Sequence, residues 1–193
     1  SATATSGPGL ALMAEMLGLS VMAEVPSVIF VSQRGGPSTG MPTKTEQSDL
    51  NLAVFGGSGD AQRIVLAPTN VEGCWRCAGK AFEMAERYQT PVIVLLDLYL
   101  SNRYETVIVS PDERFEASSS KAMVPAKSGE KYQRFAKTDD GISPRAIPGQ
   151  AGGIHTVTGL EHNDLGRPSD QANIHMDMSE KRHNKLSKAV DHP

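Results

Sequence analysis

The chain has 193 residues, of which 39% are hydrophobic and 21% are charged, and its formal net charge is −3. These values are ordinary for a soluble globular protein and exclude disordered and fibrous chains. There is no basic stripe for nucleic acid and no apolar run long enough to cross a membrane, so we expect neither partner and a cytoplasmic location.

The first unit of the chain reads as a strand, a turn and a helix. Residues 1–5 have the pattern of a short strand, and Ser6-Gly7-Pro8-Gly9 forms a turn with Pro8 at a favourable first helical position. Apolar residues at three- and four-residue spacing then predict an amphipathic helix over about residues 8–23. They are Leu10, Met13, Leu17 and Val21. Because the chain begins on a strand and without a Met, we interpret it as an N-terminally truncated fragment.

Residues 27–32 are apolar at nearly every position, which is typical of a parallel strand buried on both faces. This strand leads directly into the loop of residues 33–46, which begins Gln33-Arg34-Gly35-Gly36-Pro37-Ser38-Thr39-Gly40. Such a loop places polar groups at the carboxyl edge of an α/β sheet, so we interpret it as the edge of an active site. Gly35, Gly36 and Gly40 permit a tight turn, and Arg34 suits a carboxylate or phosphate. An ordinary surface loop with a solvated arginine is the alternative.

The next unit repeats this order. A helical segment over about 47–55 precedes a strand over 63–67, and Asn70 is the expected N-cap of a helix that ends near Tyr88. The residues expected to form its buried stripe are Val71, Trp75, Ala78, Phe82 and Ala85. A further apolar strand, 92–96, ends at Asp97. This alternation predicts an α/β fold, a three-layer sandwich with a mostly parallel sheet, over residues 1–110.

Residues 111–193 have a different character. Residues 117–131 show no periodicity, and residues 139–153 are dense in Gly and Pro, so we expect an extended, irregular linker that leads toward a further domain. The tail of about 171–190 is polar, with Met176, Met178 and Leu186 as its few anchors. It predicts a helix that needs a partner to pack against.

Three other groups of residues are candidate sites. Cys74 and Cys77 resemble a redox pair, but they fall inside a helix, and packing is the favoured role. His155, Glu161, His162 and Asp164 match no standard spacing of metal ligands, and no metal site is predicted. Thr43, Thr45 and Glu46 either face a substrate or begin a helix, with Thr45 as the favoured cap.

Several motifs, taken in order, carry a family resemblance. They are Thr3-Ala4-Thr5-Ser6-Gly7-Pro8-Gly9, the Arg34 loop with Pro42-Thr43-Lys44-Thr45-Glu46-Gln47, Tyr88-Gln89-Thr90-Pro91-Val92-Ile93-Val94-Leu95, residues 140–149 and residues 158–162. Together they resemble the alpha subunit of 2-oxoacid:ferredoxin oxidoreductases, most closely the 2-oxoglutarate (2-oxoglutarate synthase) type. The resemblance covers nearly the whole chain.

The resemblance implies the pyrimidine-binding domain of a thiamine diphosphate enzyme that oxidatively decarboxylates a 2-oxoacid, transfers the acyl group to coenzyme A and reduces ferredoxin. It implies a beta subunit that shares the cofactor with its Mg²⁺ and holds a 4Fe-4S cluster, within a larger oligomer. Two cysteines in this chain are too few for that cluster. Arg34 falls on the family's substrate arginine, and Gly35, Gly36, Ser38, Thr39 and Gly40 lie beside cofactor and substrate.

The resemblance also implies what this chain lacks. The family's cofactor-activating glutamate lies upstream of the Thr3 motif, and neither Glu15 nor Glu24 occupies a matching motif. We therefore expect no catalytic residue in this fragment, no activity of the chain alone, and an unpaired sheet edge. The alternatives are the same chemistry on pyruvate or branched-chain 2-oxoacids, or a non-catalytic module that only binds partner subunits.

Overall fold

The computed structural model describes residues 1–108, 122, 130–187 and 189. Residues 109–110 at the end of the predicted domain, and residues 111–121, 123–129, 188 and 190–193 of the predicted linker and tail, with His192, lie outside the described residues. Within the described part, one parallel sheet has the order β1-β2-β4-β3. Its strands are β1 (Ala2–Thr5), β2 (Ser27–Gln33), β3 (Ile64–Leu66) and β4 (Pro91–Asp97).

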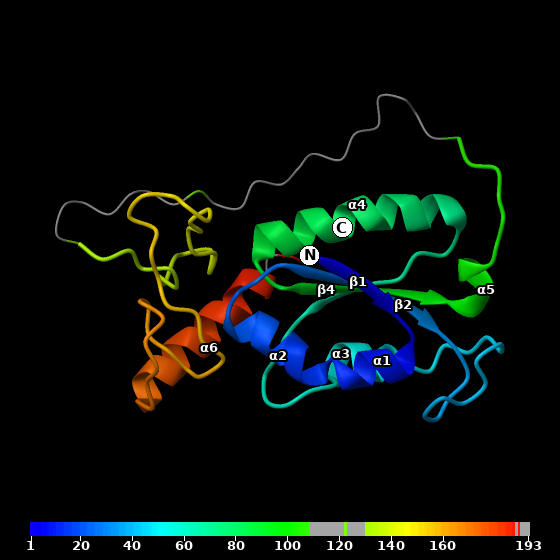
Figure 1. The fold of residues 1–193 in the computed structure, drawn as a ribbon, viewed down its shortest axis with the longest axis horizontal. Helices are drawn as coiled ribbons and strands as arrows, with labels where there is room; N and C mark the ends of the chain where they lie inside the picture. Colours follow the sequence, from blue (N-terminus) through cyan, green and yellow to red (C-terminus); the bar gives the residue numbers. More distant parts are fainter. Residues whose placement is uncertain (109–121, 123–129, 188, 190–193) are drawn as a thin grey trace.

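Two hydrophobic cores cover the two faces of this sheet. Figure 1 shows α4 (Val71–Tyr88) on one face, and α1 (Gly7–Leu12), α2 (Ala14–Met22) and α3 (Leu50–Phe55) on the other. Alternate residues of the central strands point to opposite faces, so Val28 and Val92 pack toward α4 while Ile29 and Ile93 pack toward α1 and α2. The predicted three-layer α/β fold is confirmed. Strand β1 lies at a sheet edge, and most of its residues are exposed.

The helix predicted over 8–23 is two helices. Met13 separates α1 from α2, and its N–H donates to the carbonyls of both Gly9 and Leu10 at 3.1 Å. Shared bonds of this kind are common where a helix ends. The predicted buried face is largely correct, because Leu10, Leu17 and Val21 are all buried, whereas Met13 is only partly buried.

The cap of α4 is confirmed, but its predicted buried face is fully correct only at Ala85, because Val71, Trp75 and Ala78 are partly buried. Asn70 Oδ1 accepts a hydrogen bond from the Gly73 N–H at 2.7 Å. The residues that face the sheet are Ala81, Met84, Ala85 and Tyr88, whereas Phe82 is 44% exposed. Apolar residues occur on several sides of this helix, so their spacing alone is compatible with more than one buried face. The two buried alanines let the helix backbone lie close to the sheet.

Residues 130–171 are irregular, as predicted, and lead into α6 (Ala172–Ser187), which confirms a helix in the polar tail. Of the predicted anchors, Met178 is buried and Leu186 is partly buried, but Met176 is 71% exposed. Lys181 and Lys185 of α6 are also buried, which the sequence did not predict. In the part of the chain that the structure describes, no helix is long and apolar enough to span a membrane.

Candidate active site

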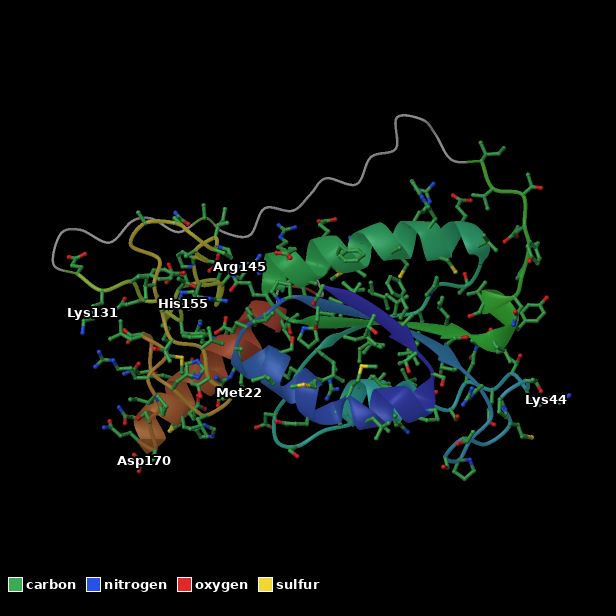
Figure 2. All side chains as sticks on the ribbon, viewed as in Figure 1. Met22, Lys44, Lys131, Arg145, His155 and Asp170 are labelled. Carbon is green, nitrogen blue, oxygen red and sulfur yellow. The ribbon has the colours of Figure 1, made fainter. Side chains whose placement is uncertain are left out.

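The Arg34 loop connects β2 to α3 at the carboxyl edge of the sheet, and Lys44 marks it in Figure 2. The loop is held together by its own backbone. The Gly35 N–H donates to the Lys44 carbonyl at 2.9 Å, and the Met41 N–H donates to the Gly35 carbonyl at 2.8 Å. Gly40 has φ +54°, and a Cβ there would lie 2.0 Å from the Gly35 oxygen, so the turn requires glycine at this position.

Arg34 is half-buried at the base of this loop. Its Nε atom is buried and has no hydrogen-bond partner among the described residues. A Cβ built on Gly36, two residues further along, would have no atom within 4 Å, so the backbone at Gly36 borders open space. Ser38, Thr39 and Gly40 are exposed at the outer part of the loop. The base of the loop therefore offers a buried cationic donor that the described residues leave unused.

Side chains that sequence reasoning had not assigned to the site anchor the loop to the sheet. Gln47 Nε2 donates to Asp97 Oδ2 at 2.7 Å, which joins the loop to the end of β4. Gln33 Oε1 accepts from the Asp49 N–H at 3.0 Å, which joins the two ends of the loop. The sequence could have identified Asp97 as a residue of the site, because a polar residue at the end of a buried parallel strand lies at the carboxyl edge of the sheet.

A cavity of about 360 Å³ lies beside these anchors. Gln33, Gln47 and Asp97 contribute its polar wall. Residues of the turn after β3 and of α5 (Leu98–Ser101), a short helix that was not predicted, also line the cavity. Asp97 also caps α5, since its Oδ1 accepts from the Leu100 N–H at 2.7 Å. One carboxylate therefore fixes both the loop and the helix that border the cavity.

The prediction that Thr45 caps the next helix is wrong. Helix α3 begins at Leu50 with Asp49 in the N-cap position, and no side chain makes a capping hydrogen bond there. Thr43, Thr45 and Glu46 are exposed in the loop. Burial, and then the nearby Glu46 carboxylate, raise the pKa of Asp49. Local sequence suggested a cap at Thr45, but the anchors at residues 47 and 49 keep the chain non-helical until residue 50.

His155, one of the candidate metal ligands, lies away from the loop, since Figure 2 places His155 and Lys44 at opposite ends of the molecule. His162 is fully buried, its Nδ1–H donates to the Leu160 carbonyl at 2.8 Å, and burial lowers its pKa. Glu161 accepts hydrogen bonds from Arg182 instead of facing a metal. Among the described residues, no group of three or more potential ligands is placed to hold a metal ion.

Cys74 and Cys77 are free and partly buried on α4. Burial is the main cause that raises the pKa of each thiol. A reactive dithiol requires the opposite shift, because the thiolate is the nucleophile. The pair therefore fits the packing role that the sequence favoured.

Comparisons with known proteins identify the family of this chain. Residues 1–181 match the family model described as pyruvate flavodoxin/ferredoxin oxidoreductase, thiamine diphosphate-binding. The alpha subunit of 2-oxoacid:ferredoxin oxidoreductase 1 from Sulfurisphaera tokodaii is 44% identical over 189 residues, which are 98% of this chain and 30% of the relative. The 2-oxoglutarate oxidoreductase subunit KorA from Mycobacterium tuberculosis is 42% identical over 165 residues, covering 82% of this chain and 24% of the relative.

A solved structure is also similar. It is the 2-oxoglutarate:ferredoxin oxidoreductase from Magnetococcus marinus with 2-oxoglutarate, coenzyme A and succinyl-CoA bound, with a TM-score of 0.89 and 44% identity over 100% of this chain and 33% of that chain. The chain thus spans about a third or less of the length of these relatives. On the family match and these identities, the chain belongs to the pyruvate flavodoxin/ferredoxin oxidoreductase family, in its thiamine diphosphate-binding domain.

Proposed function

We propose that this chain is the alpha-subunit part of a 2-oxoglutarate:ferredoxin oxidoreductase. The reaction is the oxidative decarboxylation of 2-oxoglutarate with coenzyme A to succinyl-CoA, CO₂ and reduced ferredoxin. The names of the Mycobacterium tuberculosis relative and of the Magnetococcus marinus structure support this substrate. The observation that carries the proposal is the half-buried Arg34 at the carboxyl edge of the sheet, whose Nε has no partner among the described residues.

In this role Arg34 binds the carboxylate of the 2-oxoacid. A guanidinium donates two parallel hydrogen bonds to a carboxylate, which fixes both its position and its plane. That constraint matters because the bond between C1 and C2 must be aligned before CO₂ can leave. The loop's own hydrogen bonds and its anchors to Asp97 and Gln33 hold the arginine in place without a ligand.

The described residues fit one part of a thiamine diphosphate site. Open space beside Gly36 leaves room for a ligand next to the loop, and the exposed Ser38 and Thr39 hydroxyls can donate to polar groups on it. When bound, the cofactor supplies the electron sink that stabilises the carbanion left by decarboxylation. The chain's own contribution is to orient the substrate carboxylate. We place the activating glutamate outside this chain.

The remaining partners follow from the same proposal. A beta subunit would bind the diphosphate with Mg²⁺ and hold the 4Fe-4S cluster, and several alpha–beta units would assemble in the cytoplasm. Residues 1–110 would form part of the pyrimidine-binding domain, and residues 111–193 would lead to the next domain. Under this division the present chain alone has no activity.

The proposal is tested in the complete enzyme with its beta subunit, by following the reduction of methyl viologen with 2-oxoglutarate, coenzyme A and thiamine diphosphate. Arg34→Ala should lower kcat/KM by about tenfold to a hundredfold, which is the effect of losing a hydrogen bond between charged groups. Arg34→Lys keeps the charge but not the planar donor, and should recover only part of the loss. Arg87→Ala, on the exposed side of α4, is the matched control. Equal kinetics for Arg34→Ala and the control would refute the role of Arg34.

A second candidate keeps the chemistry and changes the substrate to pyruvate or a branched-chain 2-oxoacid. The name of the Sulfurisphaera tokodaii relative refers to 2-oxoacids in general, which supports this second candidate. 2-Oxoglutarate carries a second carboxylate, so its selective use requires a second cation. Comparison of kcat/KM for the three substrates in the complete enzyme separates the candidates. If the chain assembles with its partner but supports no turnover of any of the three substrates, it is instead a non-catalytic module that only binds partner subunits.

A further inference from the structure

Asp49 lies against the turn that follows β1. A Cβ built on Gly7 would be 2.5 Å from Asp49 Oδ1 and 2.6 Å from Oδ2, which is closer than real Cβ atoms approach other atoms. The carboxylate therefore fills the space that a side chain at position 7 would need. Gly7 is not among the residues with positive φ, so its backbone conformation would accept alanine. The three nearest atoms to that Cβ all belong to the Asp49 carboxyl group, so a methyl group at position 7 would require this side chain to shift.

The backbone of Asp49 is tied to the start of the same loop. Its N–H donates to Gln33 Oε1 at 3.0 Å, and Gln33, which is 5% exposed, directly precedes Arg34. Asp49 Oδ2 is buried without a hydrogen-bond partner among the described residues. A buried polar atom left unpaired costs free energy, so the surrounding packing must impose this position on the carboxylate.

We propose that Asp49 is a positioning residue for Arg34, joining the end of the Arg34 loop to the turn at Gly7. This inference rests on the proposed function of Arg34 as the substrate anchor. With Gln33 it closes the base of the loop, and with Gly7 it fixes that base against the neighbouring strand end. The position of Arg34 thus depends on two strands, β1 and β2.

The energetic reason for such an attachment is that binding a carboxylate in a reactive geometry tolerates little displacement. A shift of about 1 Å in a positioning group can lower the rate on the order of a hundredfold. A glycine-rich loop is prone to such shifts unless packing contacts hold it. Gln47 and Asp49 both restrain the end of the loop, Gln47 through Asp97 and Asp49 through its contact with Gly7.

The test is a double-mutant cycle in the complete enzyme, with KM for 2-oxoglutarate and kcat measured separately. Asp49→Ala and Gly7→Ala should each raise KM about tenfold. The double variant should be no worse than Asp49→Ala alone, because the methyl group introduced at position 7 then has room. Asp49→Asn keeps the shape and should stay within about threefold of the original KM. If Asp49→Ala does not fold, Asp49→Ser, which also leaves space beside Gly7, takes its place.

A second measurement needs no activity. Trypsin cleavage after Lys44 reports opening of the loop in the folded complex, and Asp49→Ala and Gly7→Ala should accelerate it about tenfold while Asp49→Asn should not. If Arg34→Ala leaves the kinetics unchanged but these variants still open the loop, the proposed function fails and the loop attachment stands. If KM effects are additive and cleavage after Lys44 is unchanged, the proposal for Asp49 is overturned.

Discussion

Lys181 donates a hydrogen bond to the carboxylate of Glu24 at 2.6 Å, across a separation of 157 positions, and each residue is 1% exposed. Glu24 follows the end of α2, whereas Lys181 lies on α6. Lys185, one turn further along α6, lies 3.3 Å from the same carboxylate and donates to the carbonyl of Gln89, after the end of α4, at 3.0 Å. These bonds attach the polar tail to the ends of two helices of the sheet domain.

Glu24→Gln should strongly destabilise the protein. The substitution preserves shape but leaves two buried ammonium groups without a counter-charge, and breaking a buried ion pair in this way costs about 3–5 kcal/mol. The free energy of unfolding in urea is the measurement. Glu15→Gln, at an exposed position of α2, is the matched control and should change it by less than about 0.5 kcal/mol. Similar values for both variants would show that Glu24 does not hold α6.

Lys181→Met tests whether Glu24 and Lys181 act together. Methionine keeps most of the volume of the side chain but removes the charge, so it should destabilise the protein less in the Glu24→Gln background than in the original chain. The coupling free energy from the four unfolding experiments should be about 1–3 kcal/mol. Additive effects would contradict a direct interaction.

The stability of the protein should fall in acid because of Glu24. Burial alone would raise the pKa of this carboxyl, but Lys185 and Lys181 hold it at about 2, below its ordinary value of 4.5. The folded state thus binds the proton more weakly than the unfolded state. Its contribution is fully present above about pH 4.5 and is lost as the pH falls toward 2, by about 3 kcal/mol in all. The free energy of unfolding in urea should decrease between pH 5 and pH 2, and Glu24→Gln should make this decrease smaller.

Asn70→Ala should cost about 1 kcal/mol of folding free energy, since it removes the side-chain acceptor for the Gly73 N–H at the start of α4. Thr69→Ala changes the exposed neighbouring residue, which makes no capping bond, and serves as the control. Thermal unfolding of the two variants provides the comparison. Equal melting temperatures would mean that packing alone fixes the start of the helix.

Two glycines of the Arg34 loop should respond differently to alanine. Gly40→Ala places a methyl group 2.0 Å from the Gly35 carbonyl oxygen at a positive φ, so the loop must distort, at a cost of about 1–3 kcal/mol. Gly36→Ala meets no atom within 4 Å and should leave stability unchanged. Differential scanning calorimetry would distinguish them. A stable Gly40→Ala variant would show that the turn between Gly35 and Met41 has another conformation.

Much of the sheet domain could be predicted from the sequence. Strands β2 and β4 are almost uniformly apolar, which is the pattern of buried parallel strands, and Asn70 lies where a helix cap is expected. The Arg34 motif also predicted a loop at the carboxyl edge, where the structure has it. These features depend on residues close together in the chain, so local pattern is enough to identify them.

The alternation of strands and helices, the parallel sheet, the loop that carries Arg34 and, through its motifs, the family therefore follow from the sequence alone. The folded structure was needed to show which face of α4 is buried, that Asp49 lies on Gly7, and that the lysines of α6 pair with Glu24. The physical reason is that a charged side chain in a polar segment has the pattern of a solvated surface residue. It becomes a buried partner when folding brings an opposite charge from a distant part of the chain next to it.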